Sequence, residues 1–253
     1  MSRVLLVCPE PLGHGHPAGI GIRFLEIEKV LKADGHAVTL LSPPLAAEDF
    51  ARADADVAVV QGHIANDFFA HARPMPTVID LYDPFIIENL HYYASRGAEV
   101  FTHDHVTLMQ SLLRGDFFLC ASEAQRLFWL GMLLAAGRLN PVAFEDDATL
   151  ASLIAIAPFG VPPARQRAAA TEPRVLFGGV YDWYDPILAI DAVALARESL
   201  PQISITFTKH PNPELTPQGK LAEAMKYAKK FEFVRFEPWF AYEQRAEFFD
   251  RFA

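Results

Sequence analysis

Cysteine is nearly absent from this chain of 253 residues, which contains only Cys8 and Cys120. Both fall within apolar segments that we expect to form buried strands, so they provide no disulfide framework. This cysteine usage fits a reducing compartment, and we expect a cytoplasmic protein. Long hydrophobic runs are absent as well, since no stretch reaches the roughly 20 apolar residues that a membrane-spanning helix needs. The apolar stretch at the amino terminus is too short for a signal peptide.

Basic residues are few, and no long basic run occurs. The chain carries 22 Lys and Arg residues against 31 Asp and Glu residues, which gives a formal net charge of −9. Nucleic acid is therefore not expected as a partner, because binding to its backbone requires clustered Lys and Arg. A nucleotide is compatible with this charge, since local dipoles and one or two cations can hold a single diphosphate. Residues 220–230 are a mild candidate for a basic amphipathic helix, so a peripheral contact with the inner face of the membrane is a further expectation.

Several catalytic motifs are also missing. The chain has no Gly-x-Ser-x-Gly sequence and no P-loop, so serine hydrolase and P-loop kinase functions lack support. The turn with Gly19 and Gly21 resembles a dinucleotide fingerprint, but Phe24 stands at the third glycine position. The second expected strand also ends in Leu41-Ser42-Pro43, without the acidic residue that would bind a ribose hydroxyl. An NAD or FAD site is therefore disfavoured, and no cofactor is expected.

What the chain does contain is an alternation of apolar strands and helical patterns, which favours a parallel sheet covered on both faces. One arrangement begins twice, at Arg3 and at Pro173: an apolar strand, a glycine-bearing turn and an amphipathic helix. We therefore predict an α/β fold with two Rossmann-like lobes and a cleft between them. The predicted domains are residues 1–160 and 174–253, joined by a linker at 161–173. About 80 residues follow the linker and supply roughly three strands, so we expect an incomplete second lobe.

Three helical segments of the first lobe carry specific expectations. Residues 84–114 are expected to be mostly helical, with a break at Gly97. The segment Leu127–Gly137 is the most hydrophobic helix, which we interpret as part of the core. Residues 147–153 are predicted to form a further helix before the last strand of the lobe.

Candidate ligand contacts in the first lobe lie where the predicted strands end. His14, Gly19, Gly21 and Arg23 belong to the first glycine turn and its helix, where backbone N–H groups converge. A tight turn without a ligand is the alternative for this segment. Asp83 follows the fourth strand, with Glu88 one turn later, and is the candidate catalytic residue because a carboxylate there can orient a hydroxyl or transfer a proton. Capping of the following helix is an equally open role for Asp83.

The second lobe offers a comparable segment after its first strand. Gly178 and Gly179 would expose backbone N–H groups, and Asp182 and Trp183 would lie in the loop that follows. The alternative is a capped helix with a tryptophan in the core. Asp185 precedes Pro186, which fits the start of a helix.

Lys209 and His210 follow the next strand of this lobe, again at the edge where ligands bind. A lysine there can neutralise a diphosphate, although an exposed lysine in a proline-rich turn is an equal alternative. The His-x-His pairs at 14/16 and 103/105 lack cysteines and further well-placed carboxylates nearby, so no metal site is expected.

Several segments together resemble the GT-B fold glycosyltransferases, in particular bacterial enzymes similar to glycosyltransferase family 4. They are the first glycine turn, DLYDP (80–84), DFFLCASEAQRLFWLGMLLAAGRLNP (116–141), APFGVPP (157–163), FGGVYDWYDP (177–186) and TFTKHPNP (206–213). The resemblance implies an acceptor-binding first lobe and a second lobe that binds a nucleotide sugar without a metal. Gly19 and Gly21 match the acceptor-side loop. Gly178 and Gly179 match the donor-phosphate loop, and Lys209 lies near a basic phosphate contact.

The expected function is a retaining, hexosyltransferase-type transfer from a nucleotide-sugar donor to a glycan or a lipid-linked acceptor, in polysaccharide or glycolipid assembly. A noncatalytic sugar- or partner-binding module and a nucleotide-sugar epimerase of the same fold are the alternatives. Two departures from the family pattern stand out. Asp182 and Asp185 occupy a region where the family has Arg and Lys, and Tyr82-Asp83 stands where its catalytic histidine often lies. The family's paired glutamates would follow Ala253, so we expect this chain alone to be weak or inactive.

Overall fold

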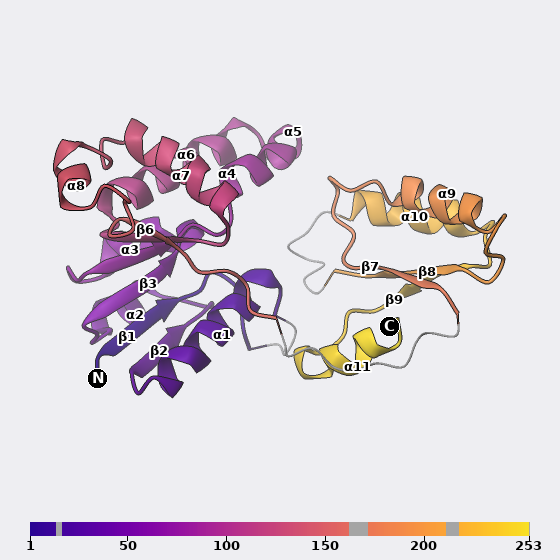
Figure 1. Ribbon diagram of the computed structural model, residues 1–253, viewed down its shortest axis with the longest axis horizontal. Coiled ribbons are helices and arrows are strands. Elements are labelled where there is room, and N and C mark those ends of the chain that lie inside the picture. The colour runs from indigo at the N-terminus through magenta and orange to yellow at the C-terminus, as the bar shows by residue number, and fades with distance from the viewer. Residues whose placement is uncertain (14–16, 162–171, 211–217, 253) are drawn as a thin grey trace. The chain divides into compact units, whose positions relative to one another are not determined.

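A computed structural model describes residues 1–13, 17–161, 172–210 and 218–252 (Figure 1). The chain separates into two compact units. The first contains Met1–Leu12 and Gly19–Val161, and the second contains Gly13, Pro17, Ala18 and the described residues from 172 onward. Among the described residues, no helix is both long enough and apolar enough to cross a bilayer.

The first unit is built on a sheet of six parallel strands in the order β2-β1-β3-β4-β5-β6. The strands are β1 (Arg3–Val7), β2 (Ala37–Leu41), β3 (Val57–Gln61), β4 (Thr77–Asp80), β5 (Phe117–Cys120) and β6 (Ile154–Ile156). The chain runs from β1 outward to β2, and then crosses back to β3 on the other side of β1. The strand order therefore reverses between β1 and β3, and open α/β sheets bind ligands at the carboxyl ends of the strands beside such a point.

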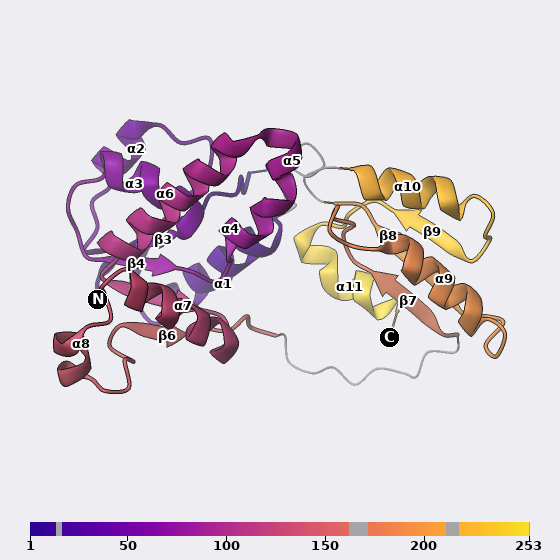
Figure 2. The ribbon, with the colours of Figure 1, turned by 90° about the horizontal axis from the view of Figure 1, so that it is seen from above.

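Helices cover both faces of this sheet because alternate strand residues are apolar on each side (Figure 2). Val4 and Leu6 pack with Phe24 of α1, whereas Leu5 and Val7 share a core with α2, α3, α6 and α7. The helices are α1 (Gly19–Ala33), α2 (Ala47–Arg52), η1 (Gly62–Ile64), α3 (Ala65–His71), α4 (Phe85–Glu88), η2 (Asn89–Tyr92), α5 (Tyr93–Arg96), α6 (Ala98–Arg114), α7 (Glu123–Ala135) and α8 (Pro141–Asp146).

The second unit has a sheet of three parallel strands in the order β7-β8-β9. Its elements are β7 (Arg174–Phe177), α9 (Pro186–Ala196), β8 (Ser204–Thr208), α10 (Gly219–Ala228), β9 (Val234–Glu237), η3 (Tyr242–Gln244) and α11 (Arg245–Asp250). Helices α9 and α10 lie over one face of this sheet, and α11 lies on the other side (Figure 1). The core contains Ile190, Ile205, Phe207 and Ala224, all fully buried.

The predicted helix at residues 147–153 is wrong. The helix lies just before it, as α8, because Asn140 caps the amino terminus and Pro141 fills its first turn. After α8, the Asp147 carboxylate accepts hydrogen bonds from the backbone N–H groups of Thr149 and Ser152. A side chain that binds these donors stabilises a turn at the expense of a helix.

Of the other two helical predictions, one is confirmed and one is only partly right. The break at Gly97 is confirmed, since this residue has a φ of 85° between α5 and α6, a conformation that favours glycine. The prediction that Leu127–Gly137 is core is only partly right. Trp129 and Leu133 are fully buried, but Leu127 and Leu134 on the opposite side of α7 are 62% and 59% exposed.

Candidate functional site

A histidine and a carboxylate meet at the carboxyl edge of the first sheet. His63 lies in η1 directly after β3, and Asp83 follows β4, the neighbouring strand. The His63 Nε2 atom lies 3.0 Å from Asp83 Oδ2, and the two side chains are 28% and 13% exposed. The pair is thus partly shielded but still reachable from solvent. Such a pair can accept or deliver a proton during a reaction.

The surroundings of His63 fix its position. Its backbone N–H donates to Gln61 Oε1 at 2.6 Å, which closes the first turn of η1. Its ring packs on Phe85, with ring centroids 4.3 Å apart. Because Phe85 is fully buried at the start of α4, the imidazole rests against a rigid surface while its Nε2 edge faces Asp83.

Glu88 adds a second carboxyl group to this pair. It lies at the end of α4 and is hydrogen-bonded to Asp83. Loss of hydration and the negative charge of Asp83 raise the pKa of Glu88 from 4.5 to about 7, although nearby His63 opposes the shift. Two carboxyl groups in contact resist simultaneous ionisation, so Glu88 keeps its proton to a higher pH than a free glutamate does.

Sequence reasoning selected Asp83 but missed His63. The signal available was weak: a Gly-His pair directly after an apolar strand, at the edge where ligands bind in such sheets. The residues are 20 positions apart, and only the pairing of β3 with β4 brings them together. The role of Asp83 as a catalytic residue stays a prediction.

Arg23 is buried beneath this edge of the sheet. Its guanidinium donates to both carboxylate oxygens of Asp80, at 2.6 and 3.0 Å, and to the carbonyl oxygen of Ala157 at 2.7 Å. The rings of Tyr82 and Phe159 lie 5.4 and 5.3 Å from the guanidinium carbon. Arg23 therefore ties α1 to β4 and to the segment after β6. A contact between Arg23 and an acceptor stays a prediction.

The first glycine turn is occupied by one of the protein's own carboxylates. Gly21 donates its N–H to Glu10 Oε2 at 2.7 Å, and Glu10 is only 8% exposed. Negative charge is stabilised at a helix amino terminus, so Glu10 takes the place there that an anionic ligand would otherwise use. Gly19 packs against Tyr82, whose hydroxyl would lie 3.2 Å from a Cβ at this position. His14 lies outside the described residues.

The glycine pair of the second unit has two different environments. Gly179 has a φ of 46° and donates its N–H to Thr208 Oγ1 at 2.8 Å, which joins the β7 turn to the end of β8. A Cβ at Gly179 would lie 3.4 Å from the ring of Tyr181. At Gly178, by contrast, a Cβ would meet no atom of the described residues within 4 Å. The space beside Gly178 is therefore open to a ligand.

Asp182 and Asp185 act on helix amino termini of the second unit. Asp182 Oδ1 accepts a hydrogen bond from the Lys220 N–H at the start of α10, at 3.0 Å. Asp185 Oδ1 accepts one from Leu188 in the first turn of α9, at 2.9 Å. Trp183 lies between them in the loop, partly buried, with its ring stacked on Tyr181 at 4.6 Å. The donor-binding roles of Asp182 and Trp183 stay predictions.

Lys209 and His210 lie side by side in sequence but differ in exposure. Lys209 is exposed, and its backbone N–H donates to the carbonyl oxygen of Glu237 at 2.9 Å. His210 is 7% exposed, with Nε2 2.9 Å from the Tyr181 hydroxyl. Gly178, Gly179, Tyr181 and these two residues all follow the carboxyl ends of β7 and β8, which are adjacent parallel strands. Donor binding by Lys209 and His210 stays a prediction.

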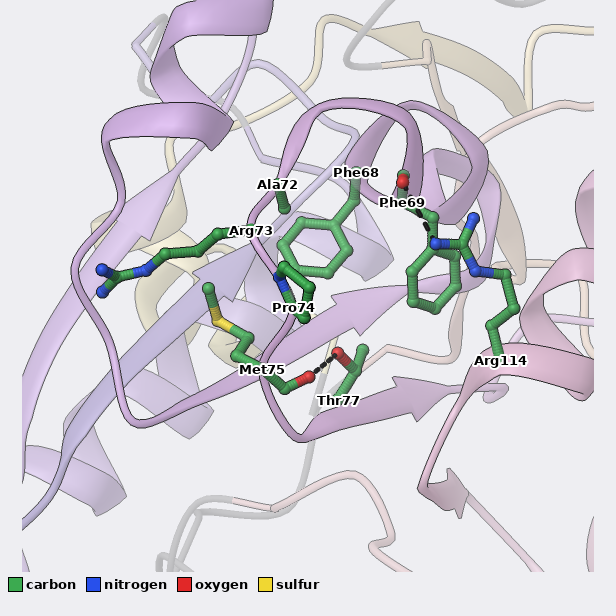
Figure 3. A pocket seen from close by; sticks show the side chains of 8 residues that line it. All are labelled: Phe68, Phe69, Ala72, Arg73, Pro74, Met75, Thr77 and Arg114. Atoms are coloured by element: carbon green, nitrogen blue, oxygen red, sulfur yellow. Dashed lines mark hydrogen bonds between the residues drawn. The ribbon is translucent and has the colours of Figure 1, made fainter.

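The first unit also has a pocket at the other end of its sheet from His63 and Asp83. It has a volume of about 190 Å³ and lies at the amino end of β4 (Figure 3). Arg73 and Arg114 line it, but Arg73 pairs with Asp54, and Arg114 donates to the carbonyl oxygen of Phe69. Within the described part of the chain, no group of three or more His, Cys, Asp or Glu side chains could hold a metal ion.

Comparisons with known proteins bear on the fold. No family model matches the chain, and no curated protein matches it by sequence. Among solved structures, MnaA of S. aureus with UDP aligns with a TM-score of 0.57 and 10% identity, over 98% of this chain and 71% of that one. HepE (Alr3699) of Anabaena with UDP-glucose aligns with a TM-score of 0.56 and 15% identity, over 95% and 70%. TarM aligns with a TM-score of 0.47 and 11% identity, over 75% of this chain and 34% of TarM.

The likenesses to MnaA and HepE confirm the predicted fold class. The chain is an α/β protein with two Rossmann-like lobes of the GT-B type. Its second lobe has three strands in the described residues, against six in the first. At 10–15% identity, the likeness to MnaA and HepE extends to the fold alone.

Proposed function

We propose that this chain acts in the transfer of a sugar, of the hexosyl type, from a nucleotide-sugar donor to a glycan or a lipid-linked acceptor. The observation that carries the proposal is the 3.0 Å pairing of His63 with Asp83 at the carboxyl edge of the first sheet. An acceptor hydroxyl loses its proton as the glycosidic bond forms. An imidazole oriented by a carboxylate is suited to receive or to steer that proton.

The proposed acceptor side consists of residues of the first lobe. His63 and Asp83 would contact the acceptor hydroxyl, and His14 and Gly19 are further candidate contacts by family resemblance. Gly21 and Arg23 would act indirectly, because their hydrogen bonds to Glu10 and Asp80 hold α1 in place. Glu10 already occupies the amino terminus of α1, which disfavours a diphosphate in this lobe.

The proposed donor side is the carboxyl edge of the second sheet. The open space at Gly178 and the exposed ammonium of Lys209 are suited to a diphosphate, since backbone N–H groups and cations stabilise its negative charge. Trp183, His210 and Asp182 would border the nucleotide or the sugar. HepE binds UDP-glucose and MnaA binds UDP in their solved structures, which makes UDP-glucose the first donor to test.

Two finer parts of the proposal come from the family resemblance alone. They are retention of the anomeric configuration and a role in polysaccharide or glycolipid assembly at the cytoplasmic face of the membrane. The anomeric proton of an isolated product, observed by NMR, decides the first. A product of inverted configuration would contradict retention and leave sugar transfer intact.

Calorimetry with the purified chain tests the function. We expect UDP-glucose and UDP to bind. We expect glycans that carry no nucleotide not to displace UDP-glucose. His63→Ala should leave UDP-glucose affinity unchanged and lower any transfer rate by about 10²–10⁴-fold, the usual contribution of a general acid or base. His71→Ala, at an exposed position at the end of α3, is the matched control and should change neither quantity.

Other outcomes would redirect the proposal. Binding of free glycans with no response to nucleotides would favour a noncatalytic module. Asp182 and Asp185, which occupy two helix amino termini of the second lobe, are the observation that favours this alternative. Conversion of UDP-glucose to an epimer without an acceptor would instead indicate a nucleotide-sugar epimerase.

A further inference from the structure

Lysine is unevenly distributed along the chain. The sequence contains seven lysines, and four of them are Lys220, Lys226, Lys229 and Lys230. All four belong to α10 or its carboxyl end, one of the two helices on the same face of the second sheet (Figure 1). A protein with a formal net charge of −9 thus concentrates more than half of its lysines on one short segment.

The packing of α10 turns these lysines outward. Leu221, Ala224 and Ala228 form its buried side and pack in the core of the second unit. Lys226, on a different side of the helix, is exposed, as are Lys229 and Lys230 after its last turn. No ion pair links any of these three lysines to a carboxylate in the described residues. By contrast, Lys220 pairs with Glu223 at 2.9 Å.

A groove runs between α9 and α10 beside these lysines. It has a volume of about 500 Å³, and its lining residues are Ile187, Glu223, Lys226, Tyr227, Lys229 and Lys230. The Tyr227 hydroxyl donates to Asp191 Oδ1 at 2.7 Å, which ties α10 to α9. Lys230 Nζ lies 3.8 Å from the centroid of the Tyr227 ring. The groove therefore has an apolar and aromatic floor with an ammonium group directly above it.

Large apolar side chains are exposed on the same pair of helices. Leu188 and Leu195 of α9 are 64% and 66% exposed, and Met225 of α10 is 41% exposed. Leu188 and Leu195 are seven residues apart, so they lie on one side of α9. That side is not the one that Ile190 and Val193 bury in the core. Lysines beside exposed aliphatic side chains are typical of helices that lie in a membrane interface.

We propose that the outer surface of α9 and α10 docks onto an anionic membrane surface, with Lys226, Lys229 and Lys230 at the lipid phosphates. Leu188 and Leu195 would enter the boundary between headgroups and acyl chains. Charge complementarity supports this partner, because a negatively charged leaflet attracts lysines and repels the rest of this acidic protein. A small soluble anion or a nucleic acid would leave the exposed Leu188 and Leu195 unused. This proposal does not depend on the transferase function.

Sedimentation of the full chain with vesicles tests the proposal. We expect binding to vesicles that contain phosphatidylglycerol, weakening with added salt, and little binding to pure phosphatidylcholine. Lys226→Glu/Lys229→Glu should reduce vesicle affinity by about 30-fold or more, because each lysine near an anionic surface contributes about a fivefold effect. The matched control is Lys29→Glu/Lys32→Glu on α1, which makes the same change of charge and should shift affinity less than about threefold.

A second variant separates membrane docking from simple attraction of anions. Leu188→Asn/Leu195→Asn removes no charge, and we expect it to weaken binding to anionic vesicles while thermal unfolding shows an intact fold. Equal binding to phosphatidylcholine, full displacement by inorganic phosphate, or unchanged binding of the lysine variant would each overturn the proposal. UDP-glucose binding by the lysine variant should stay at the wild-type level. A failure of the membrane-docking proposal is therefore distinguishable from a failure of the proposed transferase function.

Discussion

The guanidinium of Arg23 binds the carboxylate of Asp80 through two hydrogen bonds, 2.6 and 3.0 Å long, where both side chains are almost wholly removed from solvent. Asp80 is the last residue of β4, and Arg23 comes from α1. The bond therefore fixes the first helix of the lobe against the strand that leads to Asp83. A third hydrogen bond, to the Ala157 carbonyl oxygen, leaves the guanidinium well satisfied.

Removing one partner of this pair should strongly lower the free energy of unfolding. Arg23→Ala leaves the Asp80 carboxylate buried without its counter-charge, and we expect the free energy of unfolding to fall by about 3–5 kcal/mol. Urea unfolding followed by circular dichroism measures this. The control is Arg3→Ala, whose exposed pairs with Asp54 and Asp56 should contribute little to stability because solvent screens them. Equal losses in the two variants would contradict the structural role of Arg23.

Most elements of the fold follow from local patterns in the sequence, but the contacts of the site do not. The helix break at Gly97 was predictable because glycine is favoured at positive φ. Residues 147–153 were mispredicted because the Asp147 carboxylate binds nearby backbone N–H groups, a competition that hydrophobic periodicity does not register. The pairs His63–Asp83 and Arg23–Asp80 join residues 20 and 57 positions apart. They depend on strand order and register, which sequence periodicity alone does not fix.

The raised pKa of Glu88 predicts a pH-dependent effect on stability. Because this pKa is about 7 in the folded chain and its ordinary value is 4.5, the folded state holds the proton longer than the unfolded state does. The stability that this proton contributes is complete below about pH 4.5 and is lost as the pH rises through about 7. Glu88→Gln removes the titration, so we expect the variant to gain stability relative to the wild type at pH 8 compared with pH 4.5.

Urea unfolding of Glu88→Gln and the wild type across this pH range measures the difference between their free energies of unfolding. The titration of all other groups largely cancels in this difference. Glu145→Gln, at an exposed position of α8, should show no such change between pH 4.5 and pH 8. A constant difference between Glu88→Gln and the wild type would contradict the contact between Glu88 and Asp83.

Asp182 is expected to stabilise the start of α10. Asp182→Ala removes the acceptor for the Lys220 N–H and should lower the free energy of unfolding by about 1 kcal/mol, the usual value of a helix cap. Asp182→Asn keeps a side-chain oxygen in the same place and should lose much less. Thermal unfolding of the two variants compares them. Equal stability of Asp182→Ala and the wild type would show that the cap contributes nothing.

The melting temperature should respond differently to the same substitution at the two adjacent glycines of the second lobe. Gly179→Ala places a Cβ at a φ of 46°, which costs roughly 1–2 kcal/mol for an L residue, so its melting temperature should fall. Gly178→Ala adds a methyl group to open space and should leave the melting temperature unchanged. If a donor diphosphate approaches the backbone there, that methyl group will lower UDP-glucose affinity at least about tenfold in calorimetry, because it blocks the N–H groups. A Gly178→Ala variant that binds UDP-glucose like the wild type would remove the β7 turn from the donor site.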